Sequence, residues 1–595
     1  MSFNSKSILI FSYYNIYIIK YFMYPSILVT FEDIFNDEIL DFENIRSRFS
    51  LNNIALICSQ ISAYIWSKEN DQERQNELFL YLMTGENQIE VNYVSSNINK
   101  INPKVPKYLF SHVSCLMLMH YHLNSTKKYN YSEILNDRNY LIFKQILFCN
   151  SEFTGTIEKI QSIFMQKDFK DKLILMFIVF NLGQSEFSGS KNNTIFSQIL
   201  KCYEFIKYIS SKDEYKIAYS YFVNIKNVKD GYEYLKILMS TIIRFFNINQ
   251  KTDFKNIKCV IRFDKTQDKE KLLFDSISIN DEYLSNFEKD LNMDYDFKLY
   301  RDRPLFKLNN SEYAILNFKF FFDKIFNGLL YDFYKCISMS DKNIKFVDFK
   351  SVISKDYSQN ILFNDTIKII FDKYHSTLIP ERLYKKYEYG DYIVIIGNKL
   401  LLFEYKDITL SANIKNSYEY SQIINYLEDR LIVKSGIKQI INTIDNIYSR
   451  RYDFLNSYLN KIGKIEIYPI IVYSDLSLNA QGINYFINKR FKNFLNGKYI
   501  DLHVRDITMI NLDFLLFYRE LINMKKFNFI NIIDRYINYI NKNEKYFDIQ
   551  SGSAEKCLET FEMFFENYVK KVRKIQFNSS NELKEIYKKL YNSKI

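Results

Sequence analysis

The chain has 595 residues, enough for several domains, and its hydrophobic content of 47% and charged content of 25% are those of a globular protein, not of a disordered or fibrous one. Its net charge of +11 permits binding to nucleic acid through phosphate contacts but does not require it. The 7 cysteines are odd in number and form no CxxC pair, which argues against a disulfide scaffold and a thiolate zinc site and favours a reducing compartment.

The composition is unusual in its aromatic residues, since 50 Tyr and 52 Phe accompany only 13 Gly and 6 Pro. An AT-rich genome explains this bias, because its codons favour Lys, Asn, Ile, Tyr and Phe. The aromatic content alone therefore does not indicate a surface on which bases stack.

The N-terminal segment 7–19 is apolar and follows Lys6, which superficially suggests a signal peptide. However, the segment is rich in Tyr, is interrupted by Asn15, and has no small-residue cleavage site before Lys20. It is also too short to span a membrane. We expect it to form a buried strand or helix, and we expect a cytoplasmic protein with no membrane partner.

Residues from about 40 to 250 show the periodicity of amphipathic helices. Apolar residues at helical spacing include Leu109, Val113, Leu116 and Met117, and later Leu173, Met176, Phe177 and Phe180. The polar stretches 85–102 and 183–193 are predicted loops. We therefore predict a mostly helical N-terminal domain over residues 1–257, which serves sensing or assembly and offers a surface for a partner protein.

Residues 258–350 change in character and are predicted to form a connecting α+β segment. The run 259–263 alternates weakly between apolar and polar residues, as a strand does. Segments 301–308 and 313–318 are predicted to pair as a hairpin, and a helix is predicted from about residue 320 to 338.

From residue 351 onward, helical stripes alternate with strand-like runs. The predicted helices are 363–374, 437–448, 484–494 and 512–522, and the predicted strands are a hairpin at 391–406, 465–473 and 500–504. Both faces of the hairpin are apolar, so helices must cover the sheet on both sides. We predict a three-layer α/β/α domain with a mixed sheet over 351–530, a helical tail over 531–595 packed on the body or on a partner, and an α+β protein overall.

The hairpin within 389–406 turns at Gly397-Asn398, a glycine-containing pair of the kind that closes two-residue loops. With this turn, Asp391 falls directly opposite Glu404, and the two residues share a face of the sheet. Lys406 lies two residues beyond Glu404 and returns to the same face. The predicted register therefore gathers two carboxylates and an ammonium group at one end of an apolar hairpin.

Triplets of an acid, any residue and Lys carry little information alone, since about seven are expected by chance in this chain. The other examples include Asp168-Phe-Lys170, Glu214-Tyr-Lys216, Asp253-Phe-Lys255, Asp296-Phe-Lys298 and Asp348-Phe-Lys350. Glu404-Tyr-Lys406 differs because it ends an apolar strand whose partner strand carries Asp391 at the matching end. The nearest rival begins at Asp348 on a strand-like run, but no paired strand brings it a second acid.

The arrangement Asp391…Glu404-Tyr-Lys406 resembles the signature of the PD-(D/E)xK nuclease superfamily, which includes many restriction and defence endonucleases. The resemblance covers roughly residues 351–525, in the order helix, hairpin, helix, strand and helix, and does not reach the first 250 residues. Gly390 stands where the name of the motif has Pro, a change that such families tolerate.

The resemblance implies a divalent cation, Mg²⁺ or Mn²⁺, bound by Asp391 and Glu404 with the Tyr405 carbonyl as a third oxygen. Such a cation neutralises charge on the phosphate and lowers the pKa of a bound water that attacks. Lys406 would position that water or help to deprotonate it, and would stabilise the charge on the pentacovalent phosphorus. The alternative is a cross-strand ion pair that caps the hairpin, although two directly opposed acids would then repel each other.

Families of this kind usually supply a further acid from the preceding helix. Asp365 occupies roughly that place and Glu381 is an alternative, while Asp365 fits a solvated surface position equally well. Many relatives also carry a Gln on the helix after the ExK triplet, and Gln439 matches by position. Gln439 lies on the polar face of its predicted helix, so it either reaches the sheet edge or faces water.

The sequence has no GxxxxGK[ST] loop and no GxSxG, HExxH or GxGxxG motif, so other common chemistries are not predicted. We expect a Mg²⁺-dependent endonuclease that hydrolyses phosphodiester bonds, with DNA favoured over RNA as the substrate. We expect it to act in bacterial anti-phage defence or restriction. Double-strand cleavage usually needs two sites, which favours a homodimer or larger assembly. The alternative is a non-catalytic nucleic-acid-binding or scaffold subunit with a degenerate nuclease fold.

Overall fold

The computed structural model describes residues 27–592 with internal gaps. The gaps are residues 37, 47, 67–70, 102–106, 125–137, 165–173, 175–177, 180, 184–191, 250–252, 265, 286–295, 382–389, 417–418, 461–463, 496, 500–501, 525–526, 546–555 and 571–580. Within these limits, no helix has the length and apolar character needed to cross a membrane. The predicted element at 7–19 and the stripe of Leu173, Met176, Phe177 and Phe180 lie outside the described residues.

The N-terminal part is helical, as predicted. Its helices are α2 (Phe31–Ile34), α3 (Phe42–Arg46), α4 (Leu51–Ile65), α5 (Gln72–Leu82), α6 (Gln88–Lys100), α7 (His112–Leu123), α8 (Arg138–Phe164), α10 (Asn192–Ser210), α11 (Lys216–Ile225) and α12 (Gly231–Asn249). A short parallel pair, β1 (Ile27–Leu28) and β2 (Lys107–Tyr108), joins them. The loop predicted at 85–102 is wrong, because the Asn87 side chain accepts a hydrogen bond from the Glu90 N–H and starts α6, on which Val94 is buried.

The connecting segment contains a four-stranded sheet in the order β3-β6-β5-β4. Its elements are β3 (Val260–Arg262), α13 (Asp268–Asp275), β4 (Ser278–Ile279), α14 (Asp281–Ser285), α15 (Lys298–Asp302), β5 (Leu305–Asn309), β6 (Glu312–Ile315), α16 (Phe318–Asp323) and α17 (Asn327–Ser340). The predicted hairpin is confirmed as antiparallel β5 and β6. The single helix predicted at 320–338 is two helices, and the buried Lys324 between them donates to the Asp332 carboxylate at 3.3 Å.

The C-terminal half holds a six-stranded mixed sheet. Its strands are β7 (Thr377–Pro380), β8 (Tyr392–Ile396), β9 (Lys399–Lys406), β10 (Ile465–Tyr473), β11 (Leu502–Val504) and β12 (Thr508–Asn511). Strands β7, β8 and β9 are antiparallel neighbours, β9 pairs in parallel with β10, and β11 and β12 both pair in parallel with β10. The continuous apolar run of β10 suits this central position.

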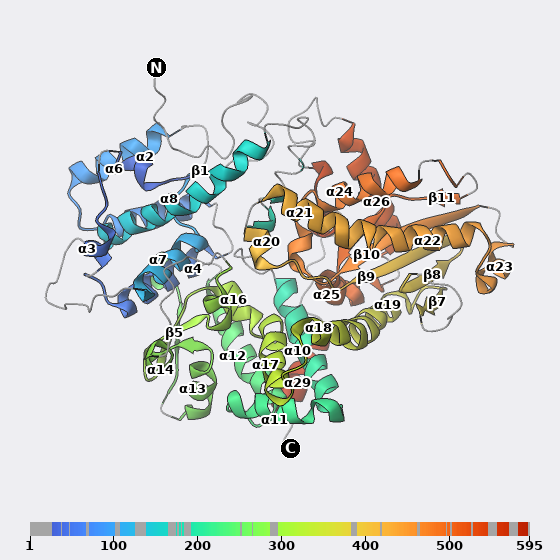
Figure 1. The fold of residues 1–595 in the computed structure, drawn as a ribbon, viewed down its shortest axis with the longest axis horizontal. Helices are drawn as coiled ribbons and strands as arrows, with labels where there is room; N and C mark the ends of the chain where they lie inside the picture. Colours follow the sequence, from blue (N-terminus) through green and yellow to red (C-terminus); the bar gives the residue numbers. More distant parts are fainter. Residues whose placement is uncertain are drawn as a thin grey trace.

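Helices cover both faces of this sheet, as its two apolar faces require (Figure 1). The helices of this half of the chain are α18 (Phe346–Ile353), the π-helix η3 (Ser354–Phe363), α19 (Asn364–Phe371), α20 (Ala412–Asn416), α21 (Tyr420–Leu427), the π-helix η5 (Glu428–Val433), α22 (Ile437–Tyr448), α23 (Asp453–Leu459), α24 (Ile483–Leu495), α25 (Leu512–Ile522), α26 (Phe529–Glu544), α28 (Phe561–Tyr568) and α29 (Asn581–Asn592). Phe363 and Phe371 pack on Phe403 from one face. Helix α22 lies on the other, and the chain is of the α+β class.

Packing crosses the predicted domain limits at 257, 350 and 530. Helix α10 packs on α25, where the Ser197 hydroxyl donates to the Asp513 carbonyl at 2.8 Å and Lys201 forms a buried ion pair with the Asp513 carboxylate. The last helix, α29, lies against α10 and α12 near the C-terminus (Figure 1), and the Tyr591 hydroxyl donates to the Lys236 carbonyl at 3.3 Å. The C-terminal tail therefore packs on the body of the protein.

Candidate functional site

The hairpin that carries the candidate site turns where the sequence predicts. Ile396 lies opposite Lys399, so Gly397 and Asn398 form the two-residue turn. The φ of Gly397 is +56°, and an added Cβ would meet no atom within 4 Å. The turn conformation, rather than a lack of space, therefore requires glycine at this position.

The same register brings the two acids of the hairpin together. Tyr392 is paired with Phe403, and one step further Asp391 lies opposite Glu404. Lys406 ends β9 on the same face, two residues beyond Glu404. The structure therefore places Asp391, Glu404 and Lys406 at one end of the hairpin.

Gly390, which stands where the motif has Pro, has no space for a side chain. A Cβ at this position would lie 2.8 Å from the carbonyl oxygen of Phe403 on the neighbouring strand. The Gly390 N–H donates to the Thr443 hydroxyl on α22 at 3.0 Å, a bond that proline cannot make. The departure from the motif is thus explained by the close approach of two strands and by the contact with α22.

We expect Gly390→Pro to lower the free energy of unfolding by about 3 kcal/mol or more, because it adds a clash with a backbone atom and removes a buried hydrogen bond. Urea unfolding followed by circular dichroism measures this. Thr443→Val avoids the backbone clash but removes the bond from Gly390 and the bond that the Thr443 hydroxyl donates to the Gln439 carbonyl at 2.9 Å, and is expected to cost about 1 to 2 kcal/mol. A Gly390→Pro protein as stable as the parent would contradict the close approach.

Lys406 connects β9 to helix α22. Its Nζ donates to Glu404 Oε1 at 2.5 Å and to Gln439 Oε1 at 2.6 Å. Gln439 Oε1 also accepts from the N–H of Gly436, at the start of α22, at 3.3 Å. Of the two positions that the sequence leaves open for Gln439, the structure shows the one at the sheet, in contact with Lys406.

Asp391 is held by two donors. The backbone N–H of Tyr405 donates to Asp391 Oδ2 at 2.6 Å, and the Gln359 amide on η3 donates to Asp391 Oδ1 at 2.7 Å. The Tyr405 ring stacks on Phe363 with centroids 5.2 Å apart. Only the backbone of Tyr405 therefore faces the site.

Glu381 joins this group from the next strand. Strands β7 and β8 pair Pro380 with Tyr392, and one step further the Glu381 N–H donates to the Asp391 carbonyl at 3.2 Å. The Gln359 amide donates to Glu381 Oε2 at 3.1 Å as well as to Asp391. Glu381, Asp391 and Glu404 thus lie in adjacent register across β7, β8 and β9. Glu404 is buried and Glu381 exposed, so the row opens to solvent at Glu381.

Burial raises the pKa of the Asp391 and Glu404 carboxyl groups. The pKa of Glu404 rises to about 8, first because burial removes the carboxylate from water and second because Asp391 lies beside it. The pKa of Asp391 rises to about 6, mainly through burial, while the Lys406 ammonium and the Tyr405 N–H act in the opposite direction. Glu404 Oε2 is buried and accepts no hydrogen bond from the described residues. A cation beside these carboxylates would favour their charged forms.

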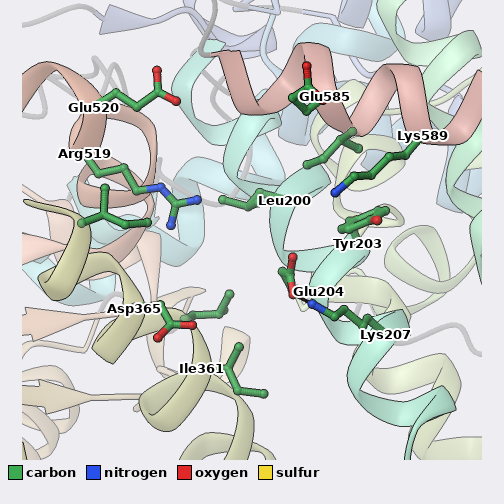
Figure 2. Close-up of a pocket in the computed structure, with 13 residues that line it drawn as sticks. Leu200, Tyr203, Glu204, Lys207, Ile361, Asp365, Arg519, Glu520, Glu585 and Lys589 are labelled. Carbon is green, nitrogen blue, oxygen red and sulfur yellow. Dashed lines mark ion pairs between the residues drawn. The ribbon is translucent and has the colours of Figure 1, made fainter.

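Asp365 does not belong to this group, which corrects its placement in the site. The buried stripe of α19 faces the sheet and turns Asp365 outward, where its side chain is 54% exposed and pairs with Lys368 at 3.0 Å. Its charge acts on Tyr392, on the sheet face opposite Asp391. Asp365 instead lines a separate pocket that also contains Arg519 (Figure 2).

The rival triplet Asp348-Phe-Lys350 lies in helix α18, so its prediction as a strand-like run is wrong. Phe349 and Ile353 are buried one helical turn apart, which fixes the helix on the core. Lys350 pairs with Asp407 at 2.8 Å. The sequence does not reveal Gln359 either, because the residue precedes the helix predicted at 363–374 and reaches the site only through η3.

The Asp391 and Glu404 carboxylates offer oxygen atoms to a cation at this end of the hairpin. Across the described part of the chain, no three His, Cys, Asp or Glu side chains are close enough together to hold a metal ion. Mg²⁺ commonly takes one or two carboxylates together with water and substrate phosphate, whereas zinc needs three or four protein ligands. With the unpartnered Glu404 Oε2, the residues present therefore fit Mg²⁺ or Mn²⁺ rather than zinc.

Comparison with known proteins identifies no relative of the chain. No protein-family model, no curated protein and no solved structure matches the chain.

Proposed function

We propose that the chain is a Mg²⁺- or Mn²⁺-dependent endonuclease of the PD-(D/E)xK type that hydrolyses phosphodiester bonds. The observation that carries the proposal is the placement of Asp391 opposite Glu404, which pairs with Lys406, at the end of one hairpin, with the pKa of both carboxyl groups raised. A purely structural ion pair would gain nothing from a second acid opposite the first.

In this proposal Asp391 and Glu404 hold the cation, and the Tyr405 carbonyl would be a third oxygen ligand. When bound, the cation neutralises charge on the phosphate and lowers the pKa of a coordinated water. Lys406, oriented by Gln439 at 2.6 Å, donates to the attacking water and to the phosphate oxygens. The water oxygen forms the new bond to phosphorus, the bond to the leaving sugar oxygen breaks, and that oxygen takes up a proton.

We further propose DNA as the preferred substrate and anti-phage defence or restriction in the cytoplasm as the setting. The net charge of +11 suits a polyanionic substrate, and the helical N-terminal region has the size to bind a partner or to assemble a homodimer. Lys438, exposed next to Gln439 on α22, adds a positive charge on the helix that contacts Lys406.

Plasmid cleavage tests the function with a matched pair of aspartates. We expect the parent to cut plasmid DNA with Mg²⁺ and to stop when EDTA is added. Asp391→Asn is expected to lower the rate at least about 100-fold, because it removes a ligand charge. Asp365→Asn is expected to cut within twofold of the parent. Equal rates in the parent and in Asp391→Asn would refute the site assignment, and an RNA of the same sequence tests the preference for DNA.

The second candidate, a non-catalytic nucleic-acid-binding or scaffold subunit, is supported by two observations. No three metal-binding side chains converge within the described ranges, and the Glu404 side chain is only 1% exposed. A parent protein that retains nucleic acid in a filter assay, yet cuts neither DNA nor RNA with Mg²⁺ or Mn²⁺, would favour this candidate.

A further inference from the structure

The Gln359 amide lies between the carboxylates of Asp391 and Glu381. Its Nε2 donates to Asp391 Oδ1 at 2.7 Å and to Glu381 Oε2 at 3.1 Å. One neutral amide nitrogen therefore links carboxylates from β8 and β7. Among the described residues, none donates to both Asp391 and Glu404. Lys406 donates to Glu404 Oε1 and to Gln439, and the second carboxylate oxygen, Glu404 Oε2, has no described donor.

The backbone that carries Gln359 is fixed on both sides. Tyr357, two residues earlier, is fully buried, and its hydroxyl donates to the Lys201 carbonyl on α10. Phe363, at the end of η3, stacks on Tyr405. The segment 354–363 is a π-helix, a rare conformation that is frequently found at functional sites. The position of the amide is therefore set by packing, not by the carboxylates alone.

Two carboxylates on neighbouring strands can hold a cation between them. The row of Glu381, Asp391 and Glu404 therefore offers two cation positions, one on each side of Asp391. A cation between Asp391 and Glu381 would need oxygen ligands about 2 Å away, which is shorter than the hydrogen bonds of an intervening amide nitrogen. The Gln359 nitrogen occupies this first place. The second place, between Asp391 and Glu404, has a free carboxylate oxygen.

We propose that Gln359 is a positioning residue that limits the site to a single divalent cation, held between Asp391 and Glu404, by filling the gap between Asp391 and Glu381 with its amide. This inference rests on the proposed nuclease function. Removal of a hydrogen-bond donor that orients a ligating carboxylate commonly lowers metal affinity about 10- to 100-fold. We expect roughly this loss of affinity for the cation at Asp391 when Gln359 is replaced.

The number of bound Mn²⁺ ions tests this role on the full chain, by calorimetric titration and by the electron paramagnetic resonance of free Mn²⁺. We expect one Mn²⁺ per parent chain. Gln359→Glu replaces the donor by a third carboxylate in the gap and is expected to bind two. Asn360→Asp adds the same charge at the next residue of η3, which donates to neither carboxylate, and is expected to bind one. Circular dichroism confirms that each variant is folded.

The outcomes separate the inference from the function on which it rests. Two Mn²⁺ ions on the parent, or one on Gln359→Glu, would overturn the role of Gln359 and leave a metal-dependent nuclease intact. No Mn²⁺ on the parent would overturn the metal site and the inference together. If Gln359→Glu does not fold, Gln359→Ser empties the gap and is expected to bind two ions, and a single ion on it overturns the inference.

Discussion

Replacing Lys406 by Met is expected to lower the rate of plasmid cleavage by about 1,000-fold, while the parent and the variant bind Mn²⁺ with similar stoichiometry. Groups that move a proton or stabilise transition-state charge at such sites typically contribute factors of about 10² to 10⁴. Met keeps most of the length and apolar volume of Lys but removes the ammonium that contacts Glu404 and Gln439. Single-turnover cleavage at saturating DNA and metal measures the effect on the chemical step.

Lys368→Met is the matched control for this prediction. Lys368, like Lys406, pairs with an acid, but its pair with Asp365 lies on the outer face of α19 at 3.0 Å with both side chains more than half exposed. We expect its cleavage rate to stay within twofold of the parent. Equal losses in the two variants would point to a general effect of lysine removal on DNA binding, and an active Lys406→Met would eliminate Lys406 from the chemistry.

Glu404→Gln is expected to stabilise the metal-free protein at pH 8 by about 2 kcal/mol or more and to remove part of the pH dependence of its stability. In the parent, the pKa of Glu404 rises from 4.5 to about 8 on folding. The folded state therefore binds more protons than the unfolded state between these values, and the free energy of unfolding falls as the pH rises through this window. The stabilising contribution of the protonated carboxyl is complete below about pH 4.5 and lost near pH 8.

Urea unfolding of both proteins at pH 5, 6, 7 and 8 in EDTA measures the difference. The stability difference in favour of Glu404→Gln should grow with pH and vanish near pH 5. Added Mg²⁺ should stabilise the parent at pH 8 and leave Glu404→Gln unchanged. As a control, Asp365→Asn changes a carboxyl group whose side chain is 54% exposed, so this variant should not gain comparable stability at pH 8. A parallel pH profile for Glu404→Gln would refute the raised pKa.

The hairpin and its two acids follow from the sequence because the interactions that fix them are local. A Gly-Asn turn between two apolar runs permits one register, and that register sets Asp391 opposite Glu404. The helices predicted at 437–448 and 512–522 match α22 and α25, since their apolar stripes are long and regular. The central strand, at 465–473, is marked by its continuous apolar run.

The completion of the site could not be predicted, because it depends on contacts between elements. Asp365 has the right residue type and order in the sequence, but the stripe of α19 turns it away from the acids. Gln359 approaches Asp391 only because η3 is a π-helix, in which the angular position of each side chain departs from the α-helical period. Glu381 is the alternative acid that the sequence offers, but its place beside Asp391 depends on the pairing of β7 with β8, and β7 has only four residues to signal it.

The packing of α10 has a consequence for how the chain folds during its synthesis. Lys201 on α10 pairs with Asp513, and the same helix lies against α29, so residues near 200 depend on partners synthesised more than 300 residues later. Tyr357, which fixes the helix that carries Gln359, bonds to the carbonyl of that same Lys201. During translation, Asp391, Glu404 and Lys406 are therefore synthesised before Asp513. The packing of α10 that holds Tyr357, and with it Gln359, is completed only afterwards. A nascent chain on the ribosome would have its acids early and its full site only after the last helix has docked.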